Sequence, residues 1–152
     1  MKKVLFRLLA VALPMLLLTT LSCKKDGNDL VRGTVWYSHT IETDAETGDP
    51  YDVITKLEFS KWGQKVTLSI TEDGEERLNI KGTYTVASYD FIALQLSHKG
   101  TNGTTTYNSF SDKGDGKWQL NYTYRLSGGG TFNYFELVVR GRIPAPEELW
   151  VL

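Results

Sequence analysis

Apolar and polar residues alternate along most of the chain from Leu30 onward. In residues 117–126, the apolar residues Trp118, Leu120 and Tyr122 are each followed by a polar residue. A period of two is typical of a strand with one buried face. Clusters of Gly, Asp and Asn separate the alternating segments and mark turns. The pattern predicts eight strands, at residues 34–42, 51–60, 65–71, 77–86, 91–97, 104–110, 117–126 and 131–142.

Short strands joined in up-and-down order predict an all-β, antiparallel fold. Eight such strands can close into a barrel, which leaves no unpaired edge; a two-sheet β-sandwich is the alternative. Gly82 interrupts a predicted strand and indicates a bulge or a bend. Charged residues such as Lys56 and Glu58 stand opposite the apolar face, so we do not expect the strands to span a membrane.

The C-terminal tail departs from the alternating pattern. Pro146, followed by Glu147 and Glu148, is a typical start of a short helix. An extended strap that lays Trp150 on the barrel is equally compatible with the sequence.

The N-terminus has the pattern of a secretory signal peptide. Lys2, Lys3 and Arg7 precede an apolar run at 8–18, and small residues lead to Cys23. The run is shorter than the ~20 residues that span a bilayer. We therefore expect a signal peptide at 1–22, a polar tether at 23–29 and one domain at 30–152.

The length and the charge balance of the chain indicate which kinds of partner to expect. Without residues 1–22 the chain has 130 residues, which suits one domain. It then has 14 basic and 18 acidic residues, a net charge of −4. A mildly acidic chain without a basic cluster argues against nucleic acid as a partner.

Cys23 is the one cysteine in the chain, so it has no internal disulfide partner. The sequence Ser22-Cys23 after an apolar run resembles a bacterial lipoprotein signal. This resemblance implies that Cys23 becomes the first mature residue and carries acyl chains, two or more of which hold a protein firmly to a membrane. The following "KKDGND" resembles the tether of outer-membrane lipoproteins. The expected location is the cell envelope, at the outer membrane, facing either the periplasm or the surface.

The stretch "LVRGTVWYS" resembles the first strand of lipocalin-like proteins, and "GTYTV" at 82–86 strengthens the resemblance. Both are similar to the short lipocalin-like lipoproteins of Gram-negative bacteria. The resemblance implies a lipocalin-like barrel whose floor is closed at Gly33 and Trp36. It also implies that an arginine of the last strand, Arg140 or Arg142, packs on Trp36.

Aromatic residues on the inward faces are the candidate binding residues. They either fill an eight-stranded barrel or line a cavity for one small ligand. We expect a small apolar or amphipathic ligand. The alternative is a non-enzymatic module with a filled core, which meets a glycan or protein through Trp62 or Trp150. The candidate ligand-binding residues are Tyr84, Tyr107, Trp118, Tyr122 and Tyr124.

Catalytic and metal-binding signatures are weak. His39, in a predicted strand, and His98, in a predicted turn, are accompanied by no serine motif or carboxylate pair. The "SDKGDG" segment, with Asp112 and Asp115, lacks the further carboxylates of a calcium loop and is typical of a hairpin turn. We expect no enzyme activity, no cofactor and no metal.

Overall fold

The computed structural model describes residues 30–150. The predicted signal peptide, Cys23 and the tether lie outside the described residues. All eight predicted strands are present, and a short 3₁₀ helix follows them. The elements are β1 (Val35–Thr43), β2 (Pro50–Phe59), β3 (Lys65–Glu72), β4 (Glu75–Ser88), β5 (Phe91–Lys99), β6 (Gly103–Gly114), β7 (Lys117–Leu126), β8 (Thr131–Arg140) and η1 (Pro146–Leu149).

Several strands run further than predicted, because pairing continues through polar residues. Strand β5 includes His98, which the sequence had placed in a turn. Strand β6 continues into the "SDKGDG" segment, where Asp112 pairs with Trp118. The turn that follows has positive φ at Gly114, Asp115 and Gly116. This geometry is that of a tight hairpin and confirms the predicted turn.

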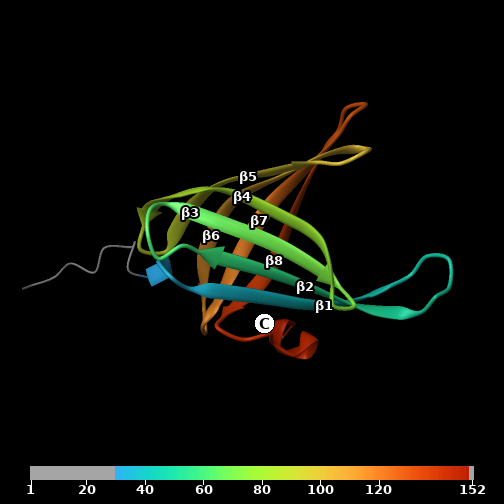
Figure 1. Cartoon of the computed structure of the whole chain (residues 1–152), viewed down its shortest axis with the longest axis horizontal. Helices are drawn as coiled ribbons and strands as arrows, with labels where there is room; N and C mark the ends of the chain where they lie inside the picture. Colours follow the sequence, from blue (N-terminus) through green and yellow to red (C-terminus); the bar gives the residue numbers. More distant parts are fainter. Residues whose placement is uncertain (1–29, 151–152) are drawn as a thin grey trace, which may run out of the picture.

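The eight strands form a closed antiparallel barrel in sequence order (Figure 1). Each strand pairs with the next, and β1 pairs with β8. The structure therefore confirms the predicted up-and-down barrel, and the sandwich alternative is wrong.

The barrel is tightly closed at one end only. Strand β1 meets β8 through two residue pairs, Trp36 with Arg140 and Tyr37 with Val139. Strand β4 meets β5 only in its second half, from Thr83 onward. Both junctions lie at the end that carries the β2–β3, β4–β5 and β6–β7 turns, which we call the closed end. Toward the other end, which we call the open end, the four strands β1–β4 diverge from the four strands β5–β8 (Figure 1).

Aromatic rings fill the closed end. The Phe110 ring stacks on Trp118, with centroids 4.7 Å apart, and meets Trp36 edge-on at 5.0 Å. Phe59 meets Tyr84 edge-on at 5.0 Å. Such offset and edge-on geometries are the favoured ones for ring pairs. The other buried apolar residues of this core are Val31, Leu57, Val66, Leu68, Ile92, Leu94, Leu96, Leu120 and Val138.

Gly82 is required by a close approach of two backbones. It pairs with Val66 in an unbroken register, so the predicted bulge does not occur there. A Cβ atom at this position would lie 2.0 Å from the carbonyl oxygen of Gln95 and 2.9 Å from Cδ2 of Leu96. Strand β4 begins to pair with β5 at the next residue, which explains why the two chains are so close.

Residues 141–150, which we call the strap, pass from the end of β8 back along β1 (Figure 1). Helix η1 starts at Pro146, as one of the two sequence alternatives predicted. Leu149 is buried, whereas the side chain of Trp150 is 74% exposed. The strap thus anchors itself through Leu149. Arg142 forms an ion pair with Glu148 within it.

Candidate functional site

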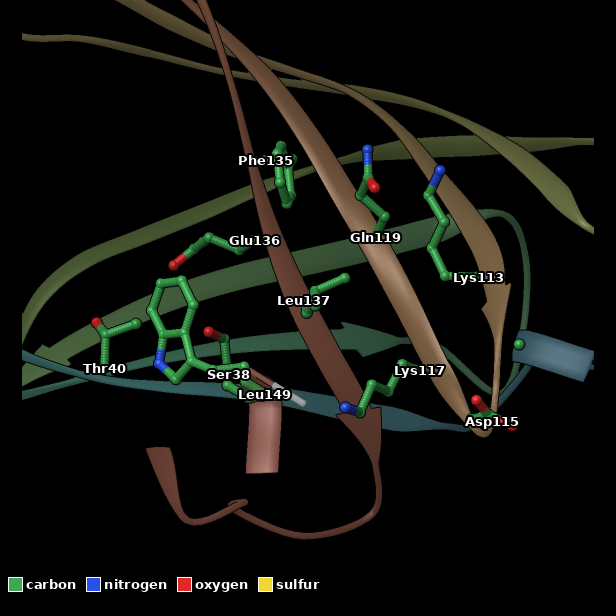
Figure 2. A pocket seen from close by; sticks show the side chains of 12 residues that line it. Ser38, Thr40, Lys113, Asp115, Lys117, Gln119, Phe135, Glu136, Leu137 and Leu149 are labelled. Carbon is green, nitrogen blue, oxygen red and sulfur yellow. The ribbon is translucent and has the colours of Figure 1, made fainter. Parts of the chain in front are cut away.

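A cavity of about 650 Å³ lies where β1 and β8 separate, beneath the strap (Figure 2). Its volume is within the range of ~300–1,000 Å³ that is usual for small-molecule sites. Its apolar lining comes from Phe135 and Leu137 of β8 and from Leu149 and Trp150 of the strap.

Charged and polar side chains stand at opposite ends of this cavity (Figure 2). Glu136 and Thr40 lie at one end, while Lys113 and Lys117 lie toward the β6–β7 turn at the other. The cavity therefore has apolar side chains between its ends, the Glu136 carboxyl at one end, and two lysines together with the carboxylate of Asp115 at the other.

Glu136 is a largely buried carboxyl on the inward face of β8. Thr55 of β2 donates a hydrogen bond from Oγ1 to Oε1 of Glu136, at 3.2 Å. Burial raises the pKa of Glu136 to about 7; the Thr55 hydrogen bond opposes the rise and the negative charge of Glu42 adds to it. Among residues 30–150, Glu136 takes part in no ion pair. A buried carboxyl without a cation is costly, and such groups cluster at functional sites.

Three tyrosines lie beside Glu136 in the barrel. The Tyr122 ring is 5.2 Å from Tyr107 and stacks on Tyr134 at 5.5 Å, centroid to centroid. Burial, followed by the charge of Glu136, raises the pKa of Tyr122 to about 12 and also raises the pKa of Tyr107. Both hydroxyls are therefore neutral donors next to the carboxyl near pH 7.

Four of the five predicted ligand-binding residues belong to the packed core or contact it. Tyr84, Tyr107 and Trp118 are buried within the core and Tyr122 packs against it, and the buried Tyr84 hydroxyl has no hydrogen-bond partner among the described residues. Tyr107 and Tyr122 adjoin Glu136, and Tyr124 pairs with Phe132 nearer the open end. None of the five lines the 650 Å³ cavity itself.

Of the predicted floor residues, Gly33, Trp36 and Arg140 lie at the closed end. Gly33, with a φ of +68°, turns the chain into β1. The indole of Trp36 is buried and donates a hydrogen bond to Oγ1 of Thr34 at 2.8 Å. Arg140 pairs with Trp36 along the backbone, but its side chain is exposed. Arg142 is engaged with Glu148 in the strap.

His39 holds the strap against β1. Its Nδ1 lies 3.0 Å from the carbonyl oxygen of Pro144, and its Nε2 lies 2.6 Å from Oδ1 of Asp52. A carbonyl and a carboxylate only accept hydrogen bonds, so this arrangement requires both ring nitrogens to donate. The imidazole is then positively charged. The hydrogen bond to Asp52 is the largest cause of the raised pKa of His39.

Replacing His39 with glutamine is expected to lower the free energy of unfolding by roughly 0.5–1 kcal/mol at pH 6 and by less at pH 8.5. Because the pKa of His39 is raised in the folded state, its contribution is fully present below the unfolded value of 6.5. The contribution disappears as the pH rises through the folded pKa. Urea unfolding between pH 5.5 and 8.5 measures the effect. Asp52→Asn should flatten the same pH profile, whereas an unchanged profile in H39Q would contradict the assignment.

The open end carries an excess of negative charge. A second hollow of about 440 Å³ lies between the β1–β2 and β3–β4 hairpins. Arg77 forms ion pairs with Glu72 and Glu75 there. The carboxylates that line it are those of Asp44, Asp49, Glu72, Asp73 and Glu75.

The sequence analysis missed the polar residues of the site. Glu136 lies in a segment, residues 135–139, whose other members are apolar on both faces, so alternation does not single out its carboxyl. The signal that the sequence offers for this site is Glu136 itself, a single acidic residue within an apolar strand segment. The sequence indicates only that His39 lies in a strand. Its partners could not be predicted, because Asp52 and Pro144 are 13 and 105 positions away along the chain.

Within residues 30–150, no group of three or more His, Cys, Asp or Glu side chains is placed to hold a metal ion. The same part of the chain contains no helix long and apolar enough to cross a bilayer. Comparisons with protein-family models, with curated proteins and with solved structures found no match to this chain.

Proposed function

We propose that this chain is a lipid-anchored binding protein of the cell envelope that holds a small amphipathic molecule beside the β1–β8 junction. The observation that carries the proposal is the 650 Å³ cavity, which is apolar along its walls and has the unpaired carboxyl of Glu136 at one end. Packed apolar side chains already fill the closed end, so the core does not depend on the Glu136 carboxyl for its stability. A buried polar group that stability does not require is best explained by a ligand.

The anchor is supported by the N-terminal pattern that ends at Cys23, which resembles a bacterial lipoprotein signal. The described chain begins beside the closed end, where the amide of Gly33 donates a hydrogen bond to the carbonyl of Ser60. An anchor at Cys23 would therefore be attached on the side of the closed end. The open end would then face away from the membrane.

Replacing Cys23 with serine is expected to release the protein from membranes, because serine offers no thiol for acylation. Fractionation of cells and mass spectrometry of the mature N-terminus measure the two effects. Wild-type protein should sediment with membranes and carry the mass of its acyl chains. Unchanged membrane association of the C23S variant would refute lipidation.

Native mass spectrometry tests the binding function separately from the anchor. Protein that is exported behind a cleavable signal peptide without a lipidation site, so that it starts at Lys24, should retain a bound mass of a few hundred daltons after purification, consistent with the cavity volume. A Glu136→Gln variant purified in parallel should retain less of it. Absence of any bound mass, together with no binding of added amphipathic compounds, would refute the function.

A second candidate function is contact with a glycan or a protein through exposed aromatics at the closed end. Trp62, in the β2–β3 turn, is 77% exposed, and Tyr89, in the β4–β5 turn, is 74% exposed. The envelope components that the wild-type protein captures should differ from those captured by a Trp62→Ala variant. Identical capture by both proteins would count against this candidate.

A further inference from the structure

We propose that the molecule held at the β1–β8 junction is an amine, in which an ammonium group pairs with Glu136 and an apolar body lies along Phe135, Leu137 and Leu149. This inference rests on the proposed binding function and specifies its ligand class. It follows from the charges around one carboxyl and from the apolar lining of the cavity.

Among the described residues, the charges that act on Glu136 do not include a cation. Thr55 on β2 supplies a neutral hydrogen bond, and the negative charge of Glu42 on β1 helps to raise the pKa of Glu136. Glu42 is itself exposed and accepts a hydrogen bond from the hydroxyl of Tyr51. The lysines that line the cavity lie at its far end, toward the β6–β7 turn (Figure 2). Within residues 30–150, no ion pair joins Glu136 to a cation, so this end of the cavity carries negative charge when the carboxyl is ionised.

The rings around that carboxyl bring no positive charge to it either. Tyr107, Tyr122 and Tyr134 contact one another in a row from β6, β7 and β8, the first pair tilted and the second pair stacked. None of these three rings lines the cavity, so they offer a bound cation no direct contact. The ammonium group would therefore pair with the carboxylate of Glu136.

The charge of the open end favours the same class of ligand. The carboxylates of the second hollow, which lies there, outnumber Arg77. A surface field of one sign raises the local concentration of ligands of the opposite sign. The two hollows share no lining residue, so this field acts on ligands in the solution around the protein and not inside the cavity.

Isothermal titration with three matched ligands tests the inference: 1-octylamine, 1-octanol and octanoate, each at pH 7.5. Octylamine and octanol share one eight-carbon chain and differ only in the head group, and octanoate has the same total number of carbon atoms. We expect octylamine to bind at least about tenfold more tightly than octanol, because a charge-assisted hydrogen bond contributes that much. Octanoate is expected to bind most weakly.

The Glu136→Gln variant should lose the preference for octylamine while keeping its affinity for octanol. Glu46→Gln removes one negative charge from the exposed β1–β2 loop and serves as the matched control; it should keep the preference. Equal binding of amine and alcohol by the wild type, or tighter binding of octanoate, would overturn the amine inference and leave the binding function standing. Binding of none of the three ligands would overturn both.

Discussion

A Glu136→Gln variant should be more stable than the wild type at pH 8, by up to about 3 kcal/mol, and equally stable at pH 4. Burial raises the pKa of Glu136 to about 7, from an ordinary value of 4.5. A raised pKa means that the folded state favours the protonated carboxyl. Stability is then fully present below pH 4.5 and declines as the pH rises toward 7. Glutamine stays neutral and can still accept the hydrogen bond of Thr55, so the variant avoids this decline.

Urea unfolding at unit steps from pH 4 to pH 8, followed by tryptophan fluorescence, measures the difference between the two proteins. The Glu46→Gln variant is the control, since Glu46 is exposed and its replacement should change the stability by less than about 0.5 kcal/mol at any pH. If E136Q and the wild type unfold at the same urea concentration at pH 8, then the carboxyl of Glu136 is hydrated in the folded protein and its charge does not lower the stability. A gain of stability on loss of the charge would also indicate that Glu136 is kept for binding.

Replacing Gly82 with alanine is expected to lower the free energy of unfolding by about 3 kcal/mol, with a fall in the melting temperature of roughly 10 °C. The new methyl group would lie 2.0 Å from a backbone carbonyl oxygen of β5, that of Gln95. A flexible side chain could turn aside, but a carbonyl within a paired strand moves only with its strand. The β4–β5 junction would then have to separate at the point where its pairing begins.

Gly128→Ala is the matched control for this variant. Gly128 lies in the β7–β8 turn, and an added Cβ there meets no atom within 4 Å. Its replacement should change the melting temperature by no more than ~2 °C in either direction. Thermal unfolding measures the melting temperatures of both variants. Equal effects at the two positions would show that the loss of a glycine, rather than the approach to Gln95, is responsible.

The strands and their order could be predicted from the sequence because each strand has one face on the core. Alternation such as that of Trp118, Leu120 and Tyr122 reports this burial directly, and glycines such as Gly74 mark the hairpins. The ends of β4 and β6 could not be predicted, because backbone pairing continues where both faces are polar. Asp112 is an example: it belongs to β6 although it buries nothing.

The candidate site could be predicted only in part. The inward rings of Tyr107 and Tyr122 follow from alternation, whereas their proximity to Glu136 depends on how β8 is placed against β7. Strand β8 misled the sequence analysis because its outward residues Phe135 and Leu137 are apolar too. They line the cavity instead of the barrel core, and Phe135 is still 61% exposed. Alternation alone cannot separate a core residue from an apolar residue that lines a surface cavity.

The two residue pairs that join β1 to β8 also bear on the order of folding. Trp36 and Arg140 are about one hundred positions apart, whereas every other neighbouring pair of strands is a hairpin whose contacts are local. Closing a long loop costs more chain entropy than closing a short one, and here only two pairs compensate for it. We therefore expect the meander to form first as an open sheet, with circularisation as the final step.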